Sequence, residues 1–152
     1  MPLALNPDIF KAYDVRGTYP DQIHEDAARA IGAAFVAYLK AKRIGVGRDM
    51  RLSSPSLAAA FIEGATSQGA DVIDYGQVPT DMVYYAVATD GLDGGVQVTA
   101  SHNPKQYNGL KMVRQGASAL SGDEGIGDIR DMIASGTTPP PATVLAYATL
   151  AT

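Results

Sequence analysis

The sequence contains no cysteine among its 152 residues. A disulfide framework and thiol chemistry are therefore excluded, and the absence agrees with a reducing compartment such as the cytosol. The two histidines, without any thiolate to accompany them, exclude a structural zinc site of the usual kind. The hydrophobic residues, 46% of the chain, suffice for a single core.

An excess of positive charge is also missing. Lys and Arg number 12 against 16 Asp and Glu, which gives a net charge of −4. Nucleic acids and anionic membranes attract basic surfaces, so we expect neither as a partner. The longest apolar helical stretch, residues 27–39, carries Arg29 and is too short to span a bilayer. Asn6, Pro7 and Asp8 interrupt any apolar leader. We expect a soluble, cytoplasmic protein.

Familiar nucleotide-binding and hydrolase motifs are missing as well. The Gly-x-Gly segments that begin at Gly45 and Gly125 lack the third glycine of a dinucleotide-binding loop. No Gly-Lys-Ser/Thr segment forms a P-loop, and the Gly-x-Ser-x-Gly elbow of many serine hydrolases is absent. A function has to be sought in other parts of the chain.

The sequence does contain a regular alternation of helix and strand patterns. Apolar residues at helical spacing predict helices over 24–43, 54–69, 80–87 and 126–133. Short apolar runs predict strands at 44–48, 71–75, 96–100 and 109–114. This alternation predicts an α/β fold, a three-layer α/β/α sandwich with a mostly parallel mixed sheet in which one or two strands are reversed.

Short polar residues mark the expected helix starts, and prolines mark the end of the domain. Ser54 and Thr80 are candidate N-caps, and Ser121 with Glu124 fits a capping box. Residues 137–142, TTPPPA, resemble an extended linker. We therefore predict one domain over residues 1–136. Residues 137–152 would be a linker and the start of a second domain that this chain lacks.

The most informative segment is GVQVTASHNPKQYNGLK, residues 95–111. Its first part alternates apolar and polar residues, which predicts a strand with one apolar face. The strand should end at Ser101-His102-Asn103-Pro104, because Asn-Pro favours a turn and proline cannot donate a ladder hydrogen bond. Ligands bind at the carboxyl ends of strands in open α/β sheets. We therefore expect a functional site around Ser101.

The residues alone leave three roles open for Ser101. A serine at a strand end often hydrogen-bonds its own turn. It could instead be a hydrolase nucleophile, although the elbow motif is missing. The third role is a phosphoserine, whose charge of about −1.5 to −2 requires cations nearby. The candidate cations near expected turns or element ends are His102, Lys105, Lys111, Arg16 and Arg48.

Four segments of the chain, in the correct order, resemble the α-D-phosphohexomutases. VTASHNP at 98–104, continued by YNGLK at 107–111, is similar to the phosphoserine signature of that family. FKAYDVRG at 10–17 resembles its amino-terminal loop, in the Tyr-Asp form of phosphomannomutase/phosphoglucomutase enzymes. GRDMRLSS at 47–54 and VPT at 78–80 resemble two further loops. The resemblance extends over roughly residues 8–135.

The resemblance implies a role for each matching residue. Ser101 would be the phosphoserine that donates and regains the phosphoryl group, and its phosphate would contact a metal ion. His102 and Lys111 would assist proton transfer and neutralise charge. Arg16 would face the same group, and Tyr13 would shape the substrate pocket, so that Tyr13, Arg16 and Lys111 bind substrate.

Four neighbouring residues have less definite roles. Asn103 is expected to hold the turn. Arg48, Asp49 and Arg51 fit two interpretations, support of the site or a salt-bridged loop.

The implied reaction interconverts hexose 1-phosphate and hexose 6-phosphate, of glucose and/or mannose, through a bound 1,6-bisphosphate. The enzymes of this family have four domains, and this chain resembles the first. Mg²⁺ would be bound mainly by the missing second domain, together with the Ser101 phosphate. The expected partners are hexose phosphates and the remaining domains, and the 152 residues alone should be inactive. The alternative is a free-standing, non-catalytic domain that binds a sugar phosphate or a protein partner.

Overall fold

The computed structural model describes residues 4–141 and 148–149 of the chain. The helices of the described part are α1 (Glu25–Leu39), α2 (Ser54–Ser67), α3 (Thr80–Thr89) and α4 (Ile126–Ser135), with 3₁₀ turns η1 (Pro7–Ile9) and η2 (Gln115–Ala117). The strands are β1 (Val15–Thr18), β2 (Arg43–Arg48), β3 (Asp71–Gln77), β4 (Gly94–Val98), β5 (Tyr107–Arg114), β6 (Ser118–Ala119) and β7 (Ala148–Thr149).

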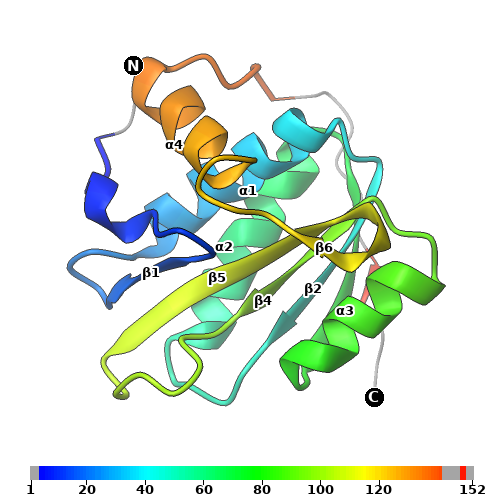
Figure 1. The fold of residues 1–152 in the computed structure, drawn as a ribbon, viewed down its shortest axis with the longest axis horizontal. Helices are drawn as coiled ribbons and strands as arrows, with labels where there is room; N and C mark the ends of the chain where they lie inside the picture. The colour runs from blue at the N-terminus through cyan, green and yellow to red at the C-terminus, as the bar shows by residue number, and fades with distance from the viewer. Residues whose placement is uncertain (1–3, 142–147, 150–152) are drawn as a thin grey trace.

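The strands form one mixed sheet (Figure 1). The strand order is β1-β5-β4-β2-β3-β7, and β6 also pairs with β5. The pairs β2–β4, β2–β3 and β3–β7 are parallel, whereas β1, β4 and β6 all run antiparallel to β5. Among the described strands β5 alone is therefore reversed. The sequence-based prediction of a mostly parallel mixed sheet is confirmed.

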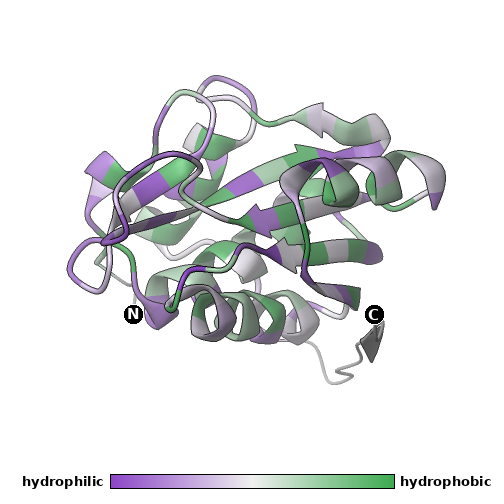
Figure 2. Cartoon of the chain, turned by 90° about the horizontal axis from the view of Figure 1, so that it is seen from below, coloured by the Kyte–Doolittle hydropathy of each residue, from purple (hydrophilic) through white to green (hydrophobic). Residues whose placement is uncertain are grey.

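Helices cover the sheet on both faces, which confirms the three-layer prediction. α1, α2 and α4 pack on one face around the larger core, where Phe35 and Phe61 meet with ring centroids 5.7 Å apart. α3 packs on the other face around a smaller core that includes Val83, Val87 and Leu92. Figure 2 shows the layers from the side, with helices on both faces of the sheet and hydrophobic segments, in green, in helices and strands alike.

The contact between α1 and α2 is unusually close because glycines form it. A Cβ atom added to Gly32 would lie 2.3 Å from the carbonyl oxygen of Phe61, and one added to Gly64 would lie 1.9 Å from that of Arg29. Real Cβ atoms do not approach backbone this closely. The two helices can therefore touch backbone to backbone only because both positions lack a side chain.

The helix starts differ in detail from the capping predictions. α2 already includes Ser54, whose hydroxyl donates to the Asp49 carboxylate instead of capping the helix. α3 includes Thr80 and follows Pro79. Ser121 accepts a bond from the Glu124 N–H, but α4 begins later, after Gly125, whose N–H donates to Asp128. Tertiary partners compete for these short polar side chains, which a local pattern cannot reveal.

The strand that precedes Ser101 also differs from its prediction. β4 covers Gly94–Val98 and is buried on both faces, with Gln97 only 1% exposed. The predicted apolar face, with Val96 and Val98, is confirmed, but the opposite face is buried as well, because β4 is central and α3 covers the face of Gln97. The Gln97 amide instead donates to the Val78 carbonyl. β1 was not predicted, since its four residues are too short for a clear pattern.

Two expectations concern the end of the chain and membranes. Residues 137–141 form neither helix nor strand, and the expected start of a second domain lies outside the described residues except for β7. No helix in residues 4–141 or 148–149 combines the length and the apolar character that crossing a membrane requires. The predicted cytoplasmic location stays a prediction.

Candidate functional site

Several chain segments meet at the edge of the sheet where the parallel strands end. β2 ends at Arg48 and β4 at Val98, and the two strands are neighbours in register. The loop 49–53 after β2 therefore lies beside the loop 99–106 after β4. β5 begins at this edge and β1 ends there. This is the edge at which ligands bind in open α/β sheets.

A cleft of about 740 Å³ opens at this edge. One wall is the loop 49–53, and the opposite wall belongs to the segment 99–106, which contributes Ser101 and Lys105. Tyr19 and Ser56 complete the lining. A volume of this size is typical of small-molecule sites. Ser101, the residue singled out by the sequence, lines this cleft.

Ser101 occupies a strained turn on the rim of this cleft. It is exposed and has φ +56°, a left-handed conformation that non-glycine residues rarely adopt. Its N–H donates to Thr99 Oγ1 at 3.0 Å. Asn103 closes the turn, with its N–H and its side-chain amide both donating to the Ala100 carbonyl. The expectation that Asn103 holds the turn is confirmed.

Asp49 is the polar centre beneath the turn. Its carboxylate accepts hydrogen bonds from the hydroxyls of Ser54 and Thr99, the latter at 2.7 Å, and from the Arg51 N–H at 3.0 Å. Burial alone would raise the pKa of Asp49. The hydrogen bonds from Ser54, Thr99 and Arg51 and the positive charge of Arg51 outweigh burial, so the pKa lies below its ordinary value. Asp49 is therefore an anchoring anion at neutral pH.

Arg51 links the two loops. Its Nε lies 3.2 Å from the Asp49 carboxylate, and its side chain is 12% exposed. The two terminal nitrogens donate to four backbone carbonyls, three in the opposite loop and one at the first residue of β5. These are Ser101 (3.0 Å), Asn103 (2.8 Å), Pro104 (2.8 Å) and Tyr107 (3.3 Å). Asp49 and Arg51 form a salt-bridged loop, because their ion pair lies within the loop 49–53. Arg51 also supports the opposite loop, which carries Ser101.

A second carboxylate, that of Glu25, is hydrogen-bonded to two residues that line the cleft, Tyr19 and Ser56. The Tyr19 hydroxyl donates to Glu25 at 2.6 Å, and the Ser56 hydroxyl donates to the same oxygen at 2.7 Å. The bond from Tyr19 is the main cause of the lowered pKa of Glu25, and it raises the pKa of Tyr19 in turn. These contacts join the start of α1 to α2 and fix the wall that Tyr19 and Ser56 form.

Comparison with known proteins agrees with this arrangement. The family model described as phosphoglucomutase/phosphomannomutase, alpha/beta/alpha domain I, matches residues 7–139. The chain belongs to this family. A phosphomannomutase of Salmonella montevideo is 46% identical over 135 residues, which are 89% of this chain and 30% of that protein. A phosphomannomutase of Klebsiella pneumoniae is 46% identical over 131 residues, 86% of this chain and 83% of the Klebsiella sequence.

A solved structure shows the same fold. The phosphoglucomutase/phosphomannomutase family protein of Burkholderia thailandensis superposes with a TM-score of 0.88 at 34% identity, over 96% of this chain and 33% of that one. The chain thus spans about a third of this structure and 30% of the Salmonella relative. Proteins of this family can therefore contain further domains beside the one described.

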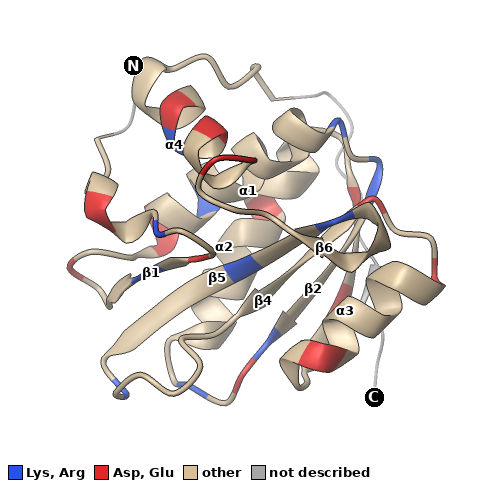
Figure 3. Cartoon of the chain, in the orientation of Figure 1, with Lys and Arg blue, Asp and Glu red and all other residues tan. Residues whose placement is uncertain are grey.

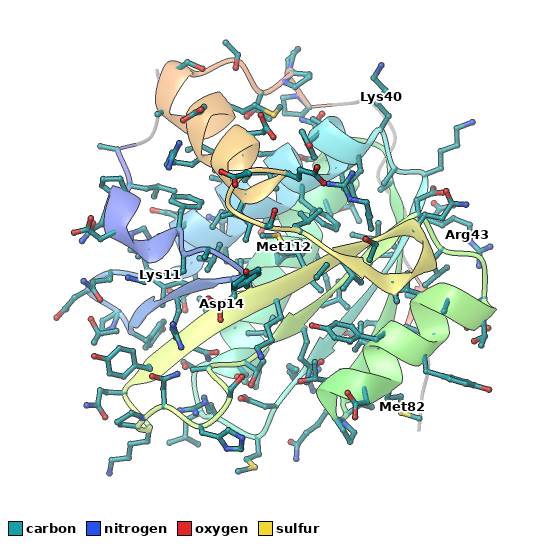
Figure 4. The ribbon with its side chains drawn as sticks, in the orientation of Figure 1. Lys11, Asp14, Lys40, Arg43, Met82 and Met112 are labelled. Carbon is teal, nitrogen blue, oxygen red and sulfur yellow. The ribbon has the colours of Figure 1, made fainter. Side chains whose placement is uncertain are left out.

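The other predicted site residues of this family domain are not among the residues that line the cleft. His102 follows it in the turn and is exposed. Tyr13 is 76% exposed, in a turn closed by the bond from the Lys11 N–H to the Asp14 carbonyl, and Lys11 and Asp14 lie near each other in Figure 4. Within residues 4–141 and 148–149, no hydrogen bond or ion pair joins the side chains of the five predicted residues to one another.

Lys111 and Arg16 share one face of the sheet. Arg16 on β1 lies opposite Gly109 on β5, and Lys111 is two positions further along β5, so both side chains leave the sheet on the face of α3. Figure 3 shows basic segments on β1 and β5 where α3 does not cover the sheet. Lys111 pairs with Gln97, four positions before Ser101. Four positions at about 3.3 Å each, with a spacing of about 4.8 Å between the strands, put its backbone up to roughly 14 Å from Ser101.

Sequence reasoning missed three residues at the site, Thr99, Asn108 and Ser54. Asn108 is fully buried, and its amide donates to the hydroxyls of Ser53 and Ser54, which ties the start of β5 to the start of α2. A polar residue within an apolar strand is the only local signal for Asn108 or Thr99. Arg48 is not part of this network, since it pairs with Asp74 at 3.7 Å.

The described residues do not form a magnesium site by themselves. In the part of the chain that the structure covers, no three His, Asp or Glu side chains gather in a way that could hold a metal ion. The carboxylate of Asp49, which lines the cleft, already accepts bonds from Ser54, Thr99 and Arg51.

Proposed function

We propose that this domain carries the phosphoserine of a phosphohexomutase that interconverts hexose 1-phosphate and hexose 6-phosphate, of glucose and/or mannose. The observation that carries the proposal is the exposed Ser101, in a left-handed turn at the end of β4 and on the rim of the cleft. Membership of the family adds support, as do the relatives called phosphomannomutases.

In the proposed reaction, phosphorylated Ser101 transfers its phosphoryl group to a free hydroxyl of a hexose monophosphate. The bond from phosphorus to Ser101 Oγ breaks while a bond to the sugar oxygen forms. The proton of the sugar hydroxyl ends on Ser101 Oγ, with His102 as the candidate carrier. The resulting 1,6-bisphosphate then reverses its orientation in the site. The reverse transfer moves its other phosphoryl group to Ser101 Oγ, which restores the phosphoserine. Such transfers need mainly positioning and charge stabilisation from the protein.

Lys111 and Arg16 are the proposed electrostatic partners. Both project from the sheet face next to the Ser101 edge, and Lys105 lines the cleft itself. Together they would counter the two phosphate groups of the intermediate, with Tyr13 completing the pocket. We also propose that magnesium contacts the Ser101 phosphate and is held mainly by residues outside this chain. The 152 residues alone would then lack turnover.

The proposal is tested by determining whether Ser101 carries phosphate in a full-length protein that contains this domain. After incubation with glucose 1,6-bisphosphate, mass spectrometry should find phosphate on Ser101, and Ser101→Ala should abolish mutase turnover. Ser118→Ala, an exposed serine in β6, is the matched control and should remain active. Unphosphorylated Ser101 with wild-type turnover in Ser101→Ala would contradict the proposal. If there is no turnover but calorimetry shows glucose 1-phosphate bound equally by both proteins, the chain is a binding domain.

A further inference from the structure

The backbone of Ser101 is held on both sides by side chains from elsewhere in the fold. Its N–H donates to Thr99 Oγ1 at 3.0 Å, and its carbonyl accepts from Arg51 Nη2 at 3.0 Å. Between these two bonds lies the left-handed φ of +56°. A serine does not favour this conformation on its own, and such strained residues persist only where the surroundings impose them.

Arg51 fixes more than the one carbonyl. Its two terminal nitrogens reach four carbonyls between Ser101 and Tyr107, while its Nε faces Asp49. Only a planar guanidinium offers five donors in one rigid group. A lysine at this position could keep the charge next to Asp49 but could not span the four carbonyls.

The arrangement is anchored in the rigid part of the domain. Thr99 Oγ1 accepts the Ser101 N–H and donates its own proton to Asp49 at 2.7 Å. Asp49 in turn accepts from Ser54, the first residue of α2. A continuous chain of hydrogen bonds thus connects the body of the domain to the backbone of Ser101.

We infer that Arg51 and Thr99 are positioning residues, which hold Ser101 in the left-handed conformation and so set the direction of its Oγ. The inference rests on the proposed role of Ser101 in phosphoryl transfer. In-line transfer depends on the placement of Ser101 Oγ, which is the leaving oxygen when the phosphoserine donates and the attacking oxygen when it is phosphorylated again. A misplacement of about 1 Å can cost roughly 10²-fold in rate. Neither residue exchanges atoms with the substrate.

The first experiment measures the loop itself and does not depend on catalysis. Amide hydrogen exchange over residues 101–107 should accelerate on the order of tenfold in Arg51→Lys and in Thr99→Val, since the loop opens more often. Thr99→Ser keeps the hydroxyl and should exchange like the wild type. Arg114→Met is the matched arginine control, because Arg114 also donates to a backbone carbonyl, that of Glu124, at the far end of β5.

The second experiment measures function in a full-length protein that carries the domain. In Arg51→Lys and Thr99→Val, kcat and the rate of Ser101 phosphorylation by glucose 1,6-bisphosphate should fall about 10²-fold. KM should stay within about threefold, because the substrate contacts remain. Thr99→Ser and Arg114→Met should behave like the wild type.

The two experiments separate the possible failures. Wild-type exchange and wild-type kcat in both Arg51→Lys and Thr99→Val overturn the inference. Fast exchange with an unchanged phosphorylation rate also overturns it, since the loop would then need no positioning. If Ser101 carries no phosphate even in the wild type, the proposed function fails, while the exchange result still decides whether these residues hold the backbone. If Arg51→Lys does not fold, the Thr99→Val and Thr99→Ser pair decides.

Discussion

Gly64 lies where α2 touches α1 backbone to backbone, and replacing it with alanine tests how the larger core is built. The added Cβ would lie 1.9 Å from the Arg29 carbonyl oxygen, whereas ordinary contact begins at 3.4 Å. The obstacle is backbone, so no side-chain rotation can relieve it. One helix would have to shift by more than an ångström, against the packing of Phe35 on Phe61.

The expected loss of stability follows from two opposing effects. Overpacking a core costs about 1–3 kcal/mol and occasionally more. Replacing glycine by alanine within a helix gains up to about 1 kcal/mol. Because the clash is with backbone, we expect the cost of overpacking to exceed the gain. The free energy of unfolding should fall by about 2 kcal/mol, which lowers the melting temperature by roughly 4–8 °C in a domain of this size.

Urea unfolding followed by circular dichroism gives the measurement. The companion variant Gly32→Ala places its Cβ 2.3 Å from the Phe61 carbonyl, across the same helix pair. One shift of the helices relieves both clashes, so the double variant should lose less than the sum of the single losses. An increase in stability of Gly64→Ala, as helix propensity alone predicts, would refute the close contact between the two helices.

Two further predictions concern charge. The folded-state pKa of Asp49 is lowered, so its stabilising contribution is present above the ordinary Asp pKa of about 3.9 and is lost as pH falls through the lowered value. As the pH is lowered from 7 to 3, the urea midpoint of unfolding should therefore fall less in Asp49→Asn than in the wild type. An equal fall in both proteins would count against the prediction. In a full-length protein, Lys111→Met or Arg16→Met should cost about 2–4 kcal/mol of transition-state stabilisation, seen as kcat/KM, with little change in melting temperature. Near-normal activity with a collapsed melting temperature would make both residues structural.

Much of the fold could be predicted from the sequence because its determinants are local. The helical spacing over α1, α2, α3 and α4 and the apolar runs of β2 to β5 gave the order of elements and the fold class. The short strands β1, β6 and β7 carry too few residues for such a pattern. Their existence depends on pairing with β5 and β3, which only the assembled sheet provides.

The turn at Ser101 was predictable for the same local reason, since the Asn103-Pro104 pair favours a turn. The network that holds this turn was not. Arg51 and Asp49 lie some fifty positions before the residues they contact, and their meeting depends on β2 and β4 being parallel neighbours. The Ser54 hydroxyl was predicted to cap α2 but bonds Asp49 instead, and this too depends on the tertiary structure. Hydrogen bonds between distant segments follow from the register of the sheet, which no periodicity in a single chain segment encodes.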